Sequence, residues 1–114
     1  MSNVVARALI LLSVALATPA AGSVNGFAIV NRTGGALRDV ALRRVGDRAW
    51  QPLSLAAAPG ASARVDFKDK DCAFDLRATV AGVGRLLWSG VNLCDVKSVT
   101  LNRDSSGRLW VDYD

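Results

Sequence analysis

Apolar and polar residues alternate along most of the chain after residue 23, and a period of two is typical of β-strands that bury one face. Ala63, Val65 and Phe67 alternate with charged residues, and a similar alternation runs from Cys72 to Val80. No helical period of 3.6 occurs in this part of the chain. The pattern predicts strands over 27–31, 37–45, 50–55, 63–67, 72–80, 86–94, 97–103 and 108–113.

Two of these segments leave alternatives open. In the stretch 37–45, Leu37, Ala41 and Val45 form one possible buried face, and Val40 and Leu42 form the other. The segment from Trp50 to Leu55 contains Pro52, which cannot donate a hydrogen bond to a ladder. We therefore expect an edge strand or an irregular crossing there.

The two cysteines are placed symmetrically about residue 83, the centre of the turn sequence Gly82-Val83-Gly84. A chain that folds back there brings Cys72 opposite Cys94, and directly opposed residues of an antiparallel pair lie about 4.5–5.5 Å apart, within reach of a disulfide. The sequence therefore predicts a hairpin closed by a Cys72–Cys94 disulfide, with Asn92 on its inward face. The same register pairs Phe74 with Asn92, Leu76 with Gly90, Ala78 with Trp88 and Val80 with Leu86.

A last hairpin is expected around Asp104-Ser105-Ser106-Gly107, with Leu101 opposite Trp110 and Thr100 opposite Val111. Seven or eight short strands with turns between them are typical of a small all-β domain. We predict a small antiparallel β-sandwich, or a barrel-like domain, with one cross-strand disulfide.

The N-terminus has the three parts of a secretory signal peptide. Arg7 precedes an apolar run from Ala8 to Ala17, and small residues follow it. The apolar run is too short to remain as a membrane anchor. We expect residues 1–22 to be a signal peptide helix, with cleavage after Ala17, Ala20 or Gly22, and 23–114 to be a single domain. Export to the periplasm or the exterior is also where disulfides form.

The mature chain is small, so the disulfide matters for its stability. Closing the 23-residue loop from Cys72 to Cys94 contributes about 3 kcal/mol in the chain-entropy model. Typical domains have stabilities of about 5–15 kcal/mol.

The composition removes most catalytic chemistry. The chain has no His, and all of its 10 acidic residues are Asp. Catalytic triads, Cys–His pairs and imidazole metal sites are therefore excluded, and the disulfide consumes both thiols. We expect a protein that is not an enzyme and carries no cofactor.

Without Arg7, 13 basic residues remain and the net charge is +3, dispersed along the chain. That charge gives weak attraction to anionic surfaces, while export argues against a nucleic-acid partner.

Two clusters are candidate binding groups. Asp66, Asp69 and Asp71 lie in one charged link and can supply three of the carboxylates that a divalent cation needs, and Asp95 or Asp75 can approach them across the hairpin. Lys68 and Lys70 oppose this interpretation by neutralising the local field. Among the tryptophans, Trp88 and Trp110 are expected in the core, and Trp50 is expected to be exposed for a partner.

Several segments resemble a family of small exported bacterial proteins. These are FAIVNRTG, CAFDLRA, VNLCDV and VTLNR, together with Trp88. The resemblance implies an exported, disulfide-linked β-fold, and it carries no activity and no functional residues. The chain differs at Gly82-Val83-Gly84, where the family has acidic residues.

The sequence thus predicts a non-catalytic, exported binding or adaptor domain whose partner is another envelope protein or a cell-surface component. The alternative is a binder of a divalent cation or small ligand that uses the Asp66–Asp71 link. The oligomeric state is left open.

Overall fold

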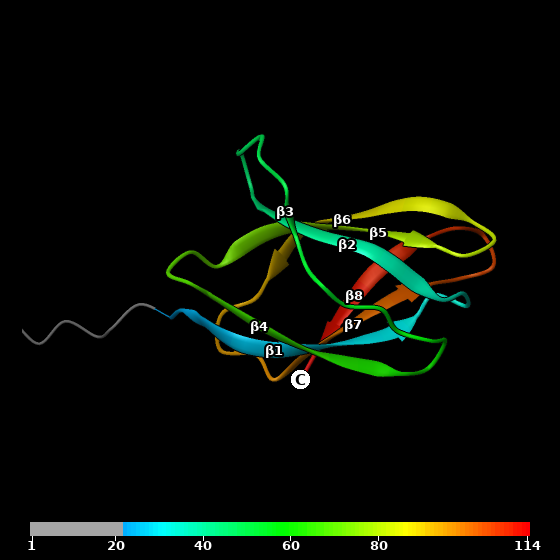
Figure 1. Ribbon diagram of the computed structural model, residues 1–114, viewed down its shortest axis with the longest axis horizontal. Helices are drawn as coiled ribbons and strands as arrows, with labels where there is room; N and C mark the ends of the chain where they lie inside the picture. The colour runs from blue at the N-terminus through cyan, green and yellow to red at the C-terminus, as the bar shows by residue number, and fades with distance from the viewer. Residues whose placement is uncertain (1–21) are drawn as a thin grey trace, which may run out of the picture.

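The computed structural model describes residues 22–114, which form eight β-strands in two sheets (Figure 1). The predicted signal peptide and its cleavage positions after Ala17 and Ala20 lie outside the described residues, which begin at Gly22. Within these residues no helix is long and apolar enough to cross a membrane. The strands are β1 (Val24–Arg32), β2 (Leu37–Arg44), β3 (Gln51–Pro52), β4 (Ser62–Asp69), β5 (Ala73–Val80), β6 (Gly84–Asn92), β7 (Ser98–Arg103) and β8 (Leu109–Tyr113).

The strands are divided equally between two sheets that face each other. Sheet A has the order β4-β1-β7-β8, and sheet B has the order β3-β2-β5-β6. This arrangement confirms the predicted all-β sandwich. One pairing differs from the antiparallel expectation, because β1 and β7 run parallel, with Ala28 paired to Ser98.

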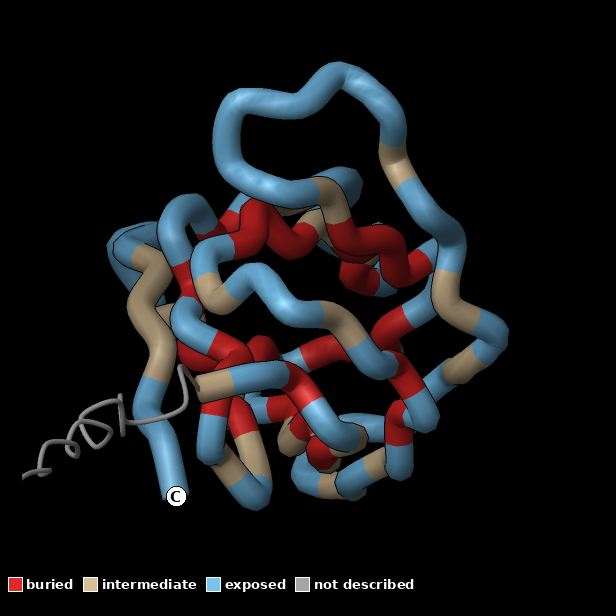
Figure 2. Tube along the Cα trace, turned by 90° about the vertical axis from the view of Figure 1, so that its left-hand side faces the viewer, coloured by how far each residue is buried: buried red, intermediate tan, exposed pale blue. Residues whose placement is uncertain are grey.

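A single hydrophobic core lies between the sheets, and the buried segments face inward while the connecting loops are exposed (Figure 2). Phe67 of sheet A and Phe74 of sheet B meet edge to face, with ring centroids 5.4 Å apart. The inward residues predicted for the first hairpin arm, Phe74, Leu76, Ala78 and Val80, are all buried.

A β-bulge in β2 resolves the two alternative faces of that strand. The register with β5 shifts between Arg38 and Ala41, and Asp39 has a φ of 51°. The extra residue lets Leu37 point inward before the bulge, Val40 within it and Leu42 after it; all three are buried. Each alternative therefore describes part of the strand.

The predicted disulfide is confirmed, but the register used to predict it was wrong. Cys72 and Cys94 are bonded, with their Cα atoms 5.0 Å apart. Near the turn, Val80 pairs with Gly84 and Leu76 with Trp88, two residues away from the expected partners. A bulge between Phe74 and Leu76, at which Gly90 has a φ of 65°, then moves the pairing toward the cysteines. Asn92 consequently lies on the exposed side, contrary to the prediction.

The last hairpin also differs by one residue from the predicted register. Leu101 pairs with Val111, and Asn102 pairs with Trp110. The Asp104 carboxylate accepts hydrogen bonds from the backbone N–H groups of Ser106 and Arg108, at 3.0 and 2.9 Å. These bonds hold Arg108 in the loop instead of at the start of the strand.

Candidate functional site

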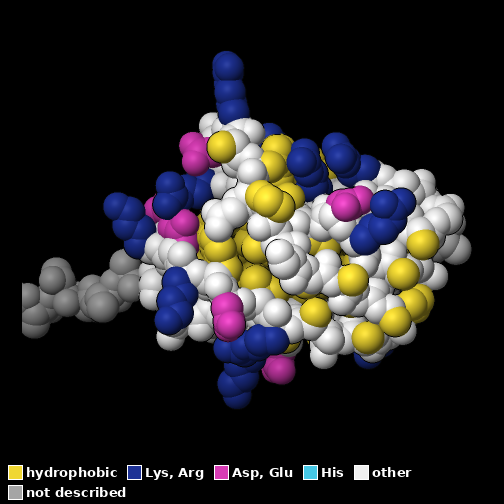
Figure 3. All heavy atoms as spheres, in the orientation of Figure 1, with side chains coloured by type: hydrophobic (Ala, Val, Ile, Leu, Met, Phe, Trp, Pro, Cys, Tyr) yellow, Lys and Arg dark blue, Asp and Glu magenta, His cyan; other side chains and the backbone are white. Residues whose placement is uncertain are grey.

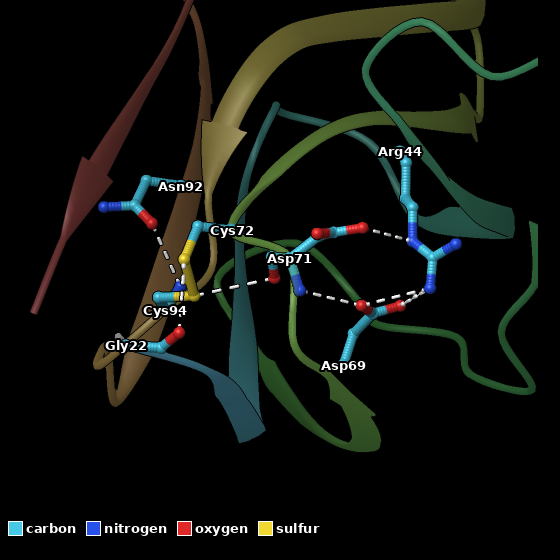
Figure 4. The surroundings of a disulfide bond; sticks show 7 residues. All are labelled: Gly22, Arg44, Asp69, Asp71, Cys72, Asn92 and Cys94. Atoms are coloured by element: carbon cyan, nitrogen blue, oxygen red, sulfur yellow. Dashed lines mark hydrogen bonds and ion pairs between the residues drawn. A yellow bond between two sulfur atoms is a disulfide. The ribbon is translucent and has the colours of Figure 1, made fainter. Parts of the chain in front are cut away.

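The predicted cation-binding link lies beside the disulfide, and an arginine occupies it (Figure 4). Arg44, at the end of β2, donates from Nη2 to the Asp69 carboxylate at 3.0 Å, and its Nε forms an ion pair with the Asp71 carboxylate at 2.7 Å. Asp71 directly precedes Cys72, so the disulfide fixes the position of the backbone from which the Asp71 side chain extends. Arg44 thus already neutralises the two carboxylates, and a metal cation would have to displace its guanidinium.

Asp69 is ionised more easily than an ordinary aspartate. The backbone N–H of Asp71 donates to its Oδ1 at 2.8 Å, and Arg44 lies on its other side. These interactions lower the pKa of the Asp69 carboxyl, with the Asp71 hydrogen bond as the largest cause.

The other predicted ligands do not join this pair. Asp66 is exposed on β4, and Asp95 is exposed after β6, where its backbone N–H donates to Ser23 at 3.4 Å. Within residues 22–114, no three acidic or cysteine side chains lie close enough together to hold a metal ion.

Trp50 is half-buried, in contrast to the exposed position predicted for it. The guanidinium carbons of Arg43 and Arg77 lie 4.5 and 4.3 Å from the centre of its ring. The segment after Trp50 pairs with β2 through Pro52 and Ala41. Because its ring contacts the outward-pointing Arg43 and Arg77, Trp50 lies over the outer face of sheet B. Its ring organises two arginine side chains on that face.

The outer face of sheet B gathers arginines from three strands, and we call this set the arginine face. Arg38 and Thr79 are paired across β2 and β5, and Thr79 is paired with Arg85 on β6. Dark blue Lys and Arg side chains lie over the upper part of the molecule, where β2 and β5 run (Figure 3). The arginine face consists of Arg38, Arg43, Arg77 and Arg85, with Trp50 between two of them.

These four arginines differ in how they are neutralised. Arg43 donates to Asp75 at 3.0 Å, and Arg38 pairs with the adjacent Asp39 at 3.1 Å. Within the described residues, Arg77 and Arg85 have no carboxylate at ion-pair distance. Both line an open hollow of about 430 Å³, which is also lined by Asp39 and by the apolar residues Pro52, Leu53 and Leu55.

Sequence reasoning missed this face because its arginines are far apart in the chain. The signal was the outward position of each arginine on its own strand, since Arg77 alternates with the buried Leu76 and Ala78. Only the order β2-β5-β6 shows that these positions adjoin.

The other two tryptophans lie on either side of a groove at the opposite edge of the sandwich. Trp88 is buried as predicted, and its indole N–H donates to the Asn102 carbonyl at 3.3 Å. Trp110, also predicted to be in the core, is only half-buried on β8, with Arg108 over its ring. Apolar side chains of β6 and β8 line this groove: Leu87, Trp88, Val91, Leu109, Trp110, Val111 and Tyr113.

Asn31 belongs to a sequence of the glycosylation type, Asn31-Arg32-Thr33, but it is fully buried. Its Nδ2 donates to the carbonyls of Gly35 and Ala57 at 2.8 and 3.0 Å. Its Oδ1 accepts from the backbone N–H and the hydroxyl of Thr33. The Asn31 side chain links the end of β1 to two loops by hydrogen bonds. Its amide nitrogen is therefore buried and not accessible for attachment of a glycan.

A scan with protein-family models, a search of curated proteins and a search of solved structures gave no match to this chain. The resemblance to small exported bacterial proteins therefore stays a prediction. A function for the chain has to be inferred from the arrangement of its side chains.

Proposed function

We propose that this protein is a non-catalytic, exported binding domain that docks onto an anionic component of the cell envelope or cell surface through the arginine face. The carrying observation is that Arg77 and Arg85 face the same hollow without an ion-pair partner among residues 22–114, while Asp39, the one carboxylate lining that hollow, is paired with Arg38. A guanidinium presents planar donors that match phosphate and carboxylate oxygens.

The surroundings of Arg77 favour this role. Stacking on Trp50 restricts the side chain while the N–H groups at the edge of the guanidinium remain able to donate. Less side-chain entropy is then lost when an anion binds. Pro52, Leu53 and Leu55 in the same hollow supply apolar contact beside the charges, which suits a ligand with both phosphate and hydrocarbon parts.

A non-catalytic role agrees with the chemistry of the described residues. Every buried side-chain nitrogen or oxygen among them has a hydrogen-bond partner within the protein. The disulfide accounts for both cysteines, and no histidine is present to transfer protons.

Vesicle co-sedimentation tests the proposal. We expect binding to vesicles that contain phosphatidylglycerol and little binding to pure phosphatidylcholine. Each arginine near an anionic membrane contributes about 1 kcal/mol, so the double variant Arg77→Ser/Arg85→Ser should bind about 30-fold more weakly. A soluble acidic polysaccharide, tested in parallel, separates a carboxylate-bearing glycan from a lipid headgroup.

The matched control is Arg32→Ser/Arg64→Ser, which removes the same charge from exposed positions of sheet A. It should keep most of the affinity. If both double variants lose binding equally, the attraction depends on net charge alone and the arginine face is not the site. Absence of binding to either anionic probe would also contradict the proposal.

A further inference from the structure

The free edge of β8 presents unpaired backbone groups. Asp114 and Ser98 exchange both of their backbone hydrogen bonds, at 3.1 and 3.2 Å, and Asp104 donates to the Arg108 carbonyl at 3.1 Å. Bonded and non-bonded residues alternate along an antiparallel pair. The N–H and C=O groups of Leu109, Val111 and Tyr113 therefore point away from β7, toward the open side of sheet A.

The two edges of sheet A differ in their protection. β4, at one edge, carries Arg64, Asp66 and Lys68 at exposed positions, and such charges discourage pairing with another strand. β8, at the other edge, has only Asp112 as a charged residue within its bounds. The edge beside the groove is therefore the one that is open to a further strand.

The groove between β6 and β8 has apolar side chains that remain partly uncovered. Tyr113 on β8 is 49% exposed, and Leu109 and Val111, which share its face of the strand, are only partly buried. The Tyr113 hydroxyl accepts a hydrogen bond from the Asn92 backbone N–H at 3.0 Å, so its ring spans the groove. A strand added next to β8 would place its own inward side chains over these residues.

We propose that the occupant of this edge is a second copy of the same chain, with the two β8 strands antiparallel and Val111 on the twofold axis. In this register the outward backbone groups of Val111 face those of the partner's Val111. Those of Leu109 face those of the partner's Tyr113, so every open donor at the edge meets an acceptor.

Charge complementarity selects the antiparallel orientation. Arg108 directly precedes β8, where it forms an exposed ion pair with Asp104 at 3.6 Å, and Asp112 and Asp114 lie toward the other end of the strand. Antiparallel pairing sets Arg108 opposite the partner's Asp114, and a parallel pairing would oppose like charges at both ends. Leu109 beside the partner's Tyr113 adds an apolar cross-strand pair on the inward face.

The twofold axis of such a pair is normal to the joined sheet, so both copies of sheet B lie on the same side of it. The inference concerns a surface separate from the arginine face, so either proposal can fail without the other.

Sedimentation equilibrium over a concentration series from 1 μM to 1 mM tests the pairing. We expect a monomer–dimer equilibrium that Val111→Pro weakens at least about 10-fold, because proline removes the central donor while its position on an edge with an outward N–H is tolerated. The matched control is Ser62→Pro on β4. Ala28 of β1 donates its backbone N–H toward β7, and Val30, two residues later, has the same backbone orientation. Ser62 is paired with Val30, so the two do not bond to each other and the Ser62 N–H points outward from the sheet, as the Val111 N–H does at the other edge.

A charge exchange tests the register without disturbing the strand. Asp114→Arg alone opposes the partner's Arg108 and should weaken dimerisation, and Arg108→Asp/Asp114→Arg in one chain should restore it. Isotope-filtered NOEs between Leu109 and the partner's Tyr113 should appear in the dimer. A chain that stays monomeric to 1 mM would overturn the proposal and leave the edge to a strand of another protein. A dimer that withstands Val111→Pro but not Ser62→Pro would overturn it as well.

Discussion

The Asp75 carboxylate accepts a hydrogen bond from the backbone N–H of Gly90, 3.1 Å away, inside the bulge that separates the two halves of β6. Its other oxygen accepts from Nε of Arg43 on β2 at 3.0 Å. One nearly buried side chain on the central pair of strands thus joins three strands of sheet B and satisfies the backbone group that the bulge leaves unpaired.

Asp75→Ala should lower the free energy of unfolding by about 2 kcal/mol, because it leaves the Gly90 N–H and the Arg43 guanidinium without their acceptor. Asp75→Asn keeps an amide oxygen for Gly90 and should lose about half as much. Urea denaturation of both variants measures the difference. Equal losses would show that the hydrogen bond to Gly90 contributes nothing measurable.

Removing the disulfide should lower the melting temperature by more than about 10 °C. The loop it closes has a sequence separation of 22 residues, which corresponds to about 3 kcal/mol, and each kcal/mol shifts the melting temperature of a domain of this size by about 4–8 °C. Thermal melts with and without a reductant measure the shift. The Cys72→Ala/Cys94→Ala variant should melt at the temperature of the reduced protein and should not respond to reductant.

Asn31→Ala should cost about 2 kcal/mol, because it leaves the buried Thr33 N–H without its acceptor and removes one of two donors from each of the Gly35 and Ala57 carbonyls. Asn25→Ala, at an exposed position of the same strand, is the control and should change stability by less than about 0.5 kcal/mol. Chemical denaturation compares the two. A small effect at Asn31 would mean that water replaces the amide in the folded state.

The lowered pKa of the Asp69 carboxyl should make the free energy of unfolding depend on pH. Its pKa is lowered in the folded protein, chiefly by the Asp71 N–H and then by Arg44. The unfolded state therefore binds the proton more readily, and the stabilisation is present above the unfolded pKa of about 3.9 and is lost as pH falls through the folded value. The difference in urea midpoint between wild type and Asp69→Asn should be constant above about pH 5 and should shrink below about pH 4. A difference that persists at pH 2 would contradict this linkage.

Millimolar Ca²⁺ should leave the melting temperature unchanged, because Arg44 already occupies the carboxylates of Asp69 and Asp71. A ligand that binds only the folded state raises its stability in proportion to the logarithm of its concentration. A rise that Asp69→Asn abolishes would restore the cation-binding alternative. Arg44→Gln tests the reason directly, since it should make the site more receptive to the ion.

The alternation of residues was enough to predict the β-sandwich, because it depends on which side chains face inward, and the placement of the two cysteines about a turn was enough to predict the disulfide. Neither was enough for the register. The bulges at Asp39 and Gly90 each insert a residue whose position is set by backbone conformation, and at Gly90 by an acceptor on another strand. A symmetric fold-back about residue 83 cannot detect such insertions. The turn is centred on Gly82, so Val80 pairs with Gly84 and Leu76 with Trp88, and the bulge at Gly90 then shifts the pairing toward the cysteines.

The candidate site was less accessible to sequence reasoning than the fold. Trp50 was identified as a residue of interest, but its two arginine neighbours come from β2 and β5 and are brought to it only by the strand order. The same applies to the open edge of β8. Its backbone orientation follows from the pairing of Asp114 with Ser98, which no local pattern reports.

The parallel pair of β1 and β7 sets the order in which the molecule can assemble. Ala28 and Ser98 are 70 residues apart (98 − 28), whereas the disulfide joins residues only 22 apart. A chain synthesised from its N-terminus makes β1 first, yet that strand gains its second neighbour only when β7 has been made. Such long-range pairing places the domain among slow folders, with times of about milliseconds to seconds. The first strand to be made is thus among the last to be fully enclosed.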